Sequence, residues 1–434
     1  MTSTGTIITN DRQARDAATA IEQLTEALSS EQVLKSLVEG LPREVIDGVR
    51  RSLTTERNEL TDLLQAYNEA KEGKPNRLRD RAAGDPGGLL VVARIARGWS
   101  QKELARRLFL PEQQIQRYEA ERYRSISLGN LIRVTRTLGL RLSADLSDQF
   151  YDQWLPTYEM AQADAQKVLK HARSHGWLDK AEQSDESGLS HLKRTVAEHV
   201  GEHGTPSLLR TGLNVEDHAE DWLLLAWKAQ VTRRAISEIS KAKARFRPID
   251  FAWLKDVVHL SAEDDGPSRV RLLLAEHGIV LIAESQIAGM NVDGAAFLVE
   301  ETPIIGLTLR HDRLDNFWFT LMHELAHIML HYRTGLSAGF FDSIETRPVD
   351  EMELEADKFA ENLLIPEELW VRSPARIAKS AEPIERLARQ LGISPAIVFG
   401  RVRMERNNYT LFSNHIGRGK VRQQLLPEYS EPSR

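Results

Sequence analysis

Two histidines four residues apart, with a glutamate directly after the first, form the part of this sequence best suited to chemistry. They are His323, Glu324 and His327. Residues four apart on an α-helix share a face, so both imidazoles could bind one metal ion. Zinc lowers the pKa of a water that it binds, and Glu324 could take a proton from that water during attack on a peptide carbonyl. The spacing predicts a zinc-dependent peptidase with Glu324 as its base. The alternative is a buried helix with two hydrogen-bonded histidines.

A mononuclear zinc site needs a third ligand from the protein. His331 lies eight residues beyond His323, which is about 12 Å along an unbroken helix. We therefore expect His331 to pack beside the site and support it. The acidic segment 351–360 offers better ligands, and its apolar spacing predicts a second helix.

Within this acidic segment, Glu353 and Asp357 share one helical face, and we expect Glu355 to point away. Glu353 is the predicted third ligand, and Asp357 is the predicted hydrogen-bond partner that fixes a ligand histidine. Glu351 or Glu355 could replace Glu353 as the ligand, and an acidic face that is only solvated is the remaining alternative. Zinc (Zn2+) is the expected ion, while manganese or iron can occupy similar ligands.

Several predicted elements position these residues. Three β-branched runs between turn residues predict strands at 278–283, 295–299 and 303–309. Apolar residues at helical spacing predict helices at 315–332, 350–364 and 382–391. We therefore expect an α+β domain with a small sheet beside the helices.

The 434 residues exceed one ordinary core and predict a multidomain, mainly α protein. We expect an antiparallel helical hairpin in residues 1–83, a compact helical domain in 84–146, a helical linker domain in 147–247 and the α+β domain in 248–434. A Gly/Ser/Asp-rich stretch predicts a loop near residues 185–190. The N-terminal hairpin could join two copies of the chain as a homodimer, or it could be a solvated spacer.

The composition excludes several classes of protein. The chain has no cysteine, which excludes disulfides, thiolate metal sites and cysteine nucleophiles. It has no apolar run that could span a bilayer, and its polar first residues lack a signal-peptide core. We expect a cytoplasmic protein without a membrane partner. The net charge of -6 argues against a nucleic-acid-coating protein, yet residues 89–141 carry eleven Lys or Arg against four Asp or Glu. That segment can attract phosphate.

The basic segment also has the pattern of two short helices joined by a tight turn. Ser100 and Glu103 form a capping box before the first helix, and the second helix follows Leu110-Pro111. In a helix-turn-helix the second helix directs its side chains to base edges in the major groove. A helix-turn-helix that contacts only protein is the alternative. The residues expected to read bases are Gln113, Gln114, Gln116 and Arg117, and those expected to contact phosphates are Lys102, Arg122 and Arg124.

Two known families resemble these segments. Ser-Gln-x-Glu-Leu-Ala at residues 100–105, followed by Ile-x-x-Tyr-Glu at residues 115–119, resembles the Xre/Cro-type helix-turn-helix family. It departs from that pattern at Leu110-Pro111, where a small polar residue more often caps the second helix. Residues 278–366 resemble the ImmA/IrrE family of metallopeptidases in the strand pair, the His-Glu-Leu-Ala-His core and the acidic helix that follows.

The ImmA/IrrE resemblance implies a zincin-like domain with ligands His323, His327 and Glu353 and the base Glu324. It also implies a protein substrate, often a transcriptional repressor. Residues 391–401 resemble the C-terminal helical extension of the family. The Xre/Cro resemblance implies binding to double-stranded operator DNA.

Taken together, these patterns predict a DNA-binding transcriptional regulator fused to a zinc endopeptidase. Its expected substrate is a repressor or an antitoxin, in a phage, toxin–antitoxin or stress-response circuit. One alternative is a transcription factor that binds metal without cleaving protein. The other is a non-enzymatic partner-binding protein, such as an antitoxin.

Overall fold

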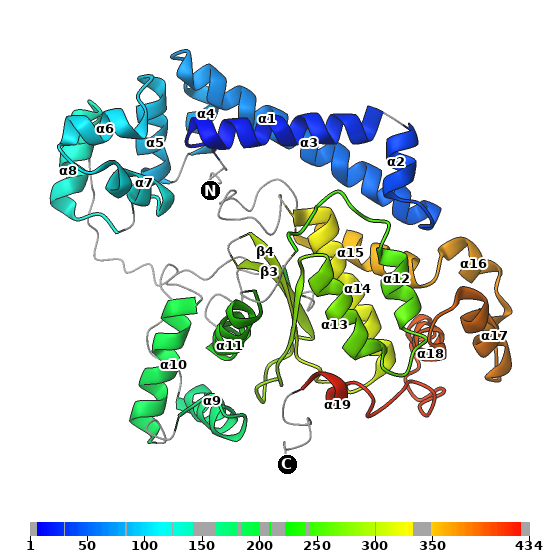
Figure 1. The fold of residues 1–434 in the computed structure, drawn as a ribbon. Helices are drawn as coiled ribbons and strands as arrows, with labels where there is room; N and C mark the ends of the chain where they lie inside the picture. The colour runs from blue at the N-terminus through cyan, green and yellow to red at the C-terminus, as the bar shows by residue number, and fades with distance from the viewer. Residues whose placement is uncertain are drawn as a thin grey trace. The chain divides into compact units, whose positions relative to one another are not determined.

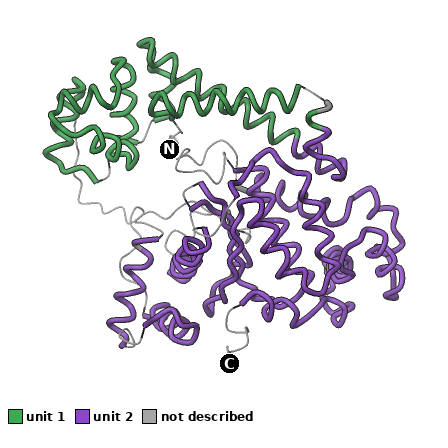
Figure 2. The backbone as a smooth tube through the Cα atoms, in the orientation of Figure 1, with its two compact units in different colours: residues 1–34, 50–151, 337–348 green, residues 35–49, 152–336, 349–434 purple. Residues whose placement is uncertain are grey.

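The structure, a computed structural model, describes residues 7–29, 31–82, 85–123, 125–141, 162–179, 184–199, 208–209, 222–239, 244–299, 301–332 and 349–426. The chain divides into two compact units, shown in different colours in Figure 2. The first comprises residues 1–34, 50–151 and 337–348, and the second comprises residues 35–49, 152–336 and 349–434.

The first unit is helical, as the sequence predicts. The helices of residues 11–137 are α1 (Asp11–Ser29), α2 (Glu31–Leu37), α3 (Arg43–Lys71), α4 (Asn76–Arg81), α5 (Pro86–Ala96), α6 (Gln101–Leu108), α7 (Glu112–Ala120) and α8 (Leu128–Thr137). The end of α2 and the start of α3, within residues 35–49, belong to the second unit. Asp11 at the start of α1 accepts hydrogen bonds from Tyr67 and Lys71 near the end of α3, at 2.9 and 2.6 Å. The two helices therefore run antiparallel.

Helices α5 to α8 form the helix-turn-helix part of this unit. The hydroxyl of Ser100 accepts a hydrogen bond from the backbone N–H of Glu103 at 3.1 Å, so the predicted N-cap is present. The Glu103 carboxylate does not return to Ser100, because it bonds with Arg106 and Arg107. A buried ion pair between Arg94 and Glu119, at 2.6 Å, ties α5 to α7. Such a pair has a fixed geometry, which orients α7 within the unit.

The second unit contains a four-stranded sheet with the strand order β1-β3-β4-β2. The strands are β1 (Leu208–Leu209), β2 (Val280–Ala283), β3 (Gly294–Val299) and β4 (Thr302–Leu307). β2 is parallel to β4, whereas β3 is antiparallel to both β4 and β1. The three predicted strands are therefore present. The sequence analysis did not predict β1, since a two-residue strand has no detectable period.

Both faces of the sheet are covered by helices, which explains why its strands are apolar without alternation. α11 (Trp222–Ile239) packs on one face and α14 (Leu314–His331) on the other (Figure 1). Ala295 and Phe297 of β3 belong to the core shared with α11. Neighbouring residues of a strand point to opposite faces, so Gly294 and Ala296 face α14.

Helices α9 (Gln162–Ser174) and α10 (Asp185–His199) complete the core on the α11 side. The loop predicted near residues 185–190 is wrong, because α10 begins there. The hydroxyl of Ser184 accepts from the N–H of Ser187 at 3.1 Å, and Asp185 and Glu186 lie in the first turn. Ser and acidic residues at these positions stabilise a helix start.

Glu284, directly after β2, connects these helices to the sheet. Its buried carboxylate accepts hydrogen bonds from the Trp177 indole at 3.1 Å and from Arg234 at 2.7 Å. Its backbone carbonyl accepts from the Trp227 indole at 3.0 Å. The helices of residues 162–239, expected as a separate linker, thus share one core with the strands. The predicted domain boundaries stay a prediction.

The remaining helices surround α14 or extend beyond it. They are α12 (Leu254–Leu260), α13 (Gly266–Glu276), α15 (Val349–Leu364), α16 (Glu367–Arg372), the 3-10 helix η5 (Pro374–Ile377), α17 (Glu382–Leu391), α18 (Pro395–Glu405) and α19 (Arg422–Leu425). α14 packs against α15 and α18, and α17 packs against α18. Across the described parts of the chain, every helix is too short or too polar to cross a membrane.

Candidate metal centre and nucleic-acid interface

The helices α14 and α15 bring the predicted metal ligands together. α14 is buried along almost its whole length, because the sheet covers one side and α15 and α18 cover others. α15 presents buried Ala356, Phe359 and Ala360 to this interior. Two alanines allow close approach of helices, since their side chains end at Cβ. The polar residues of α14 are therefore buried among apolar side chains.

His323, His327 and Glu353 form a cluster whose possible ligand atoms all lie within 4.8 Å of one another. The Nε2 atoms of the two histidines are 3.0 Å apart. Oε2 of Glu353 lies 3.2 Å from Nε2 of His323, and Oε1 of Glu353 lies 3.3 Å from Nε2 of His327. Two imidazole nitrogens and one carboxylate thus converge on one point.

These separations fit a tetrahedral metal ion. Zinc binds nitrogen and oxygen at about 2.0–2.1 Å, which places neighbouring ligand atoms of a tetrahedron about 3.3 Å apart. The two Nε2 atoms are 3.0 Å apart, and a different carboxylate oxygen of Glu353 lies within 3.3 Å of each of them. Three protein ligands also leave a fourth position for water or substrate, as catalytic zinc sites do. The donor set and its spacing therefore suit zinc or a similar divalent ion.

Three side chains support the histidines from outside this cluster. Nδ1 of His323 lies 2.9 Å from the carboxylate of Asp357, as the sequence analysis expected. Nδ1 of His327 lies 3.2 Å from Nδ1 of His331. Nε2 of His331 lies in turn 3.2 Å from the carboxylate of Glu355. Contacts of this kind fix the ring orientation of a metal ligand.

The expectation that Glu355 points away from the site is wrong. Glu355 stands beside the buried Ala356 on α15, and it reaches His331 at the end of α14. The sequence analysis placed Glu353 and Asp357 on the facing side from helical spacing alone. Glu355 also lies on the side of α15 that packs against α14, because it contacts His331 in the last turn of α14.

The charges of the cluster influence one another. Burial alone would lower the pKa of His323, but the carboxylates of Asp357 and Glu353 raise it to about 9. Burial lowers the pKa of His327 to about 3. Burial would raise the pKa of Glu353, yet hydrogen bonds from the two histidines lower it to about 2. The carboxylate is therefore ionised, and a proton and a metal ion compete for the nitrogens of His323.

Glu324 lies between the metal-ligand cluster and the sheet. It is fully buried. A Cβ atom built on Gly294 would lie 2.7 Å from Oε1 of Glu324 and 2.9 Å from the methyl group of Thr320. Only glycine allows β3 to approach Glu324 this closely. Gly294 was not among the predicted site residues, because its only signal in the sequence is a glycine just before an apolar run.

The helix-turn-helix exposes most of the residues predicted to read bases. Gln113, Gln116 and Arg117 of α7 are exposed, and so is Lys102 of α6. Gln114 is half-buried, and its amide donates to the hydroxyl of Tyr118 at 2.7 Å. Three of the four predicted base-reading side chains are therefore accessible to DNA.

The two arginines that follow α7 differ from this pattern. The side chain of Arg122 is only 11% exposed and lies 3.4 Å from the carboxylate of Asp85. Its backbone carbonyl packs so closely on Gly87 that a Cβ there would lie 1.9 Å away. Arg122 thus contacts its own domain, contrary to the expected phosphate contact. Arg124 lies outside the described residues.

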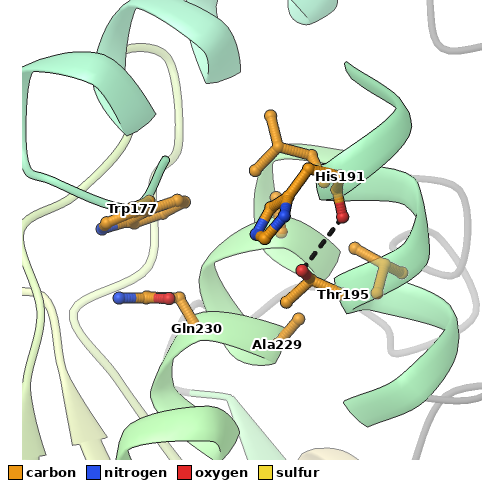
Figure 3. A pocket seen from close by; sticks show the side chains of 8 residues that line it. Trp177, His191, Thr195, Ala229 and Gln230 are labelled. Atoms are coloured by element: carbon orange, nitrogen blue, oxygen red, sulfur yellow. Dashed lines mark hydrogen bonds between the residues drawn. The ribbon is translucent and has the colours of Figure 1, made fainter. Parts of the chain in front are cut away.

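A small pocket of the second unit is separate from the metal-ligand cluster. It lies beside α10 and α11, as Figure 3 shows. Its polar lining residues include His191, Thr195 and Gln230. The Thr195 hydroxyl donates to the backbone carbonyl of His191 at 3.0 Å, within its own helix. The pocket shares no residue with the cluster.

Comparisons with known proteins agree with this geometry. Residues 274–402 match the IrrE N-terminal-like domain family, Peptidase M78, and residues 92–144 match a helix-turn-helix family. No curated protein and no solved structure matches the chain. The chain thus contains an Xre-type helix-turn-helix and a metallopeptidase-like domain, and both resemblances seen in the sequence are confirmed. The first match supports peptidase activity, and the second supports DNA binding.

Proposed function

We propose that this protein is a DNA-binding regulator whose C-terminal domain is a zinc-dependent endopeptidase. The observation that carries the proposal is the convergence of the Nε2 atoms of His323 and His327 with the carboxylate of Glu353, beside buried Glu324. A bound zinc ion would supply Lewis-acid chemistry at this point. Its proposed ligands are His323, His327 and Glu353.

The protein's own groups have separate tasks in this proposal. Asp357 holds Nδ1 of His323, so that Nε2 is directed into the cluster. His331 does the same for His327. Glu324 accepts a proton from the attacking water and returns it to the nitrogen of the departing amine. His323, Glu324 and His327 are buried, and burial strengthens electrostatic contacts between them.

The helix-turn-helix indicates the class of substrate and the nucleic-acid partner to expect. A peptidase attached to an operator-binding module suits a regulator of transcription, and we propose a repressor or an antitoxin as its substrate. The circuit would be a phage, toxin–antitoxin or stress-response circuit. Double-stranded operator DNA is the proposed partner of Gln113, Gln116 and Arg117, and a homodimer would suit a two-fold operator.

The decisive experiment replaces Glu324 by Gln in the full chain. The zinc-loaded wild-type protein is incubated with the purified products of neighbouring genes, one at a time, and fragments are detected by mass. We expect Glu324→Gln to abolish cleavage while zinc content and DNA binding stay unchanged. The matched control is Glu301→Gln, which changes an exposed carboxylate in the β3–β4 turn and should cleave normally. Normal cleavage by Glu324→Gln would show that the catalytic assignment is wrong.

A further inference from the structure

The edge of β3 is the part of the sheet nearest to the proposed base. Gly294, the first residue of β3, touches Glu324 and Thr320 of α14. One edge of β3 is paired with β4 over its whole length, from Gly294 opposite Leu307 to Val299 opposite Thr302. The other edge of β3 faces away from β4.

That second edge carries β1. Leu208 pairs with Ala296 and Leu209 pairs with Ala295 in antiparallel register. Leu209 is therefore opposite the residue that follows Gly294. β1 belongs to the segment between the two family matches, far from β3 in the sequence. The chain thus places its own backbone within one residue of the position where β3 contacts Glu324.

An endopeptidase needs its substrate in an extended form, with the scissile carbonyl held near the base. The open edge of a sheet holds extended peptides well, because its unpaired N–H and C=O groups bind the peptide backbone irrespective of sequence. A strand has two edges, and β4 already fills one edge of β3. A peptide that added to β3 beside Glu324 would therefore need the place that β1 holds.

We propose that the outer edge of β3 is the binding site for an extended substrate peptide, and that β1 fills this site as a built-in competitor. This inference rests on the proposed peptidase function. β1 holds only two residues in the ladder, so its pairing is weak enough to be displaced. Substrate binding is reduced by the fraction of time that β1 is paired. If β1 is paired nine-tenths of the time, its removal strengthens peptide binding about tenfold.

The first test measures binding without catalysis. A fluorescent peptide with the sequence of residues 204–213 is titrated into zinc-loaded full-length protein that carries Glu324→Gln. The same titration uses protein that also carries Leu208→Pro and Leu209→Pro. Proline cannot donate to a ladder, so the double substitution releases β1. The control is the Leu208→Ala, Leu209→Ala protein, which keeps both backbone N–H groups.

We expect the proline protein to bind the peptide at least about fivefold more tightly than its parent, and the alanine protein to bind like the parent. Equal binding by the parent and the proline protein would overturn the proposal, as would failure of the peptide to bind either. Because the readout is binding, this result is independent of whether Glu324 is the base.

The second test uses disulfide variants, which do not depend on the folding of the proline protein. The chain has no cysteine, so a single cross-strand disulfide can be placed cleanly at directly opposite residues. The two versions are Leu208→Cys with Ala296→Cys, and Leu209→Cys with Ala295→Cys. The disulfide holds β1 on the edge, and a reductant releases it.

Oxidation should remove peptide binding, and reduction should restore it to the level of the cysteine-free parent or above. Binding that persists in the oxidised protein would overturn the proposal. Cleavage of the zinc-loaded wild-type chain within residues 204–213 would also overturn it, since the segment would then be a substrate instead of a competitor.

Discussion

The metal-ligand cluster and the recognition helix α7 use their polar residues in opposite ways. His323, His327 and Glu324 are buried, and each histidine nitrogen that faces away from the cluster has a partner. On α7, Gln113, Gln116 and Arg117 are exposed and stay available to a partner outside the chain. The polar contacts of the first region are made within the fold itself, whereas the contacts proposed for the second require DNA. Substitutions should therefore act differently in the two regions.

The largest effect is expected inside the cluster. His327→Ala removes one of the three proposed ligands, so zinc should be lost and cleavage should fall by at least about a thousandfold. Metal analysis and a cleavage assay measure both effects. His259→Ala changes an exposed histidine of α12 and should alter neither. Retention of stoichiometric zinc by His327→Ala would show that the metal site is not built around this residue.

A buried lysine elsewhere in the same unit should affect the free energy of unfolding. Lys228 of α11 is buried against the ring of Phe297, and burial lowers its pKa to about 7. The charged form is disfavoured in the folded state, so this penalty is full below pH 7 and disappears as the pH rises toward the unfolded value near 10.5.

Lys228→Met should therefore stabilise the protein by on the order of a few kcal/mol at neutral pH. The gain should shrink steadily between pH 7 and pH 10. Urea unfolding at several pH values measures it. A gain that is the same at every pH would show that the substitution acts through packing and not through charge.

Substitution of a residue that holds a ligand histidine should have an intermediate effect on metal affinity. Asp357→Ala removes the hydrogen bond to Nδ1 of His323 but leaves every proposed ligand in place. Loss of such a partner typically weakens metal affinity 10- to 100-fold. Competition with a fluorescent zinc chelator measures the affinity. Lys358→Ala, an exposed neighbour on α15, is the control and should leave affinity unchanged.

The smallest effects are expected on the DNA side, where two arginines can be compared directly. Arg117→Ala should weaken binding to a duplex from the gene's own upstream region about tenfold, because a base-reading arginine contributes about 1–3 kcal/mol. Arg122→Ala should leave that affinity within about twofold and lower the melting temperature instead, since Arg122 pairs with Asp85. The reverse ranking would show that Arg122 leaves Asp85 when DNA binds.

The sequence predicted most of what depends on periodicity. The four-residue spacing of His323 and His327 located α14, and the acidic face of residues 351–360 located Glu353 and Asp357. Periodicity does not predict features that are determined by tertiary contacts. β1 is too short for a pattern, Glu355 is recruited by the end of α14, and Arg122 is drawn into its own domain by Asp85. Residues 185–190 were interpreted as a loop because the residues that start helices also favour turns.

The contacts of Glu284 have a practical consequence for expression of the metallopeptidase-like domain alone. The family match begins at residue 274, but the indole of Trp177 and the guanidinium of Arg234 hold the Glu284 carboxylate from well upstream. A fragment trimmed to the match would lose both hydrogen-bond partners of the Glu284 carboxylate and would expose the apolar face of the sheet that α11 covers. Such a truncated protein should precipitate, while one that starts near residue 160 should remain in solution.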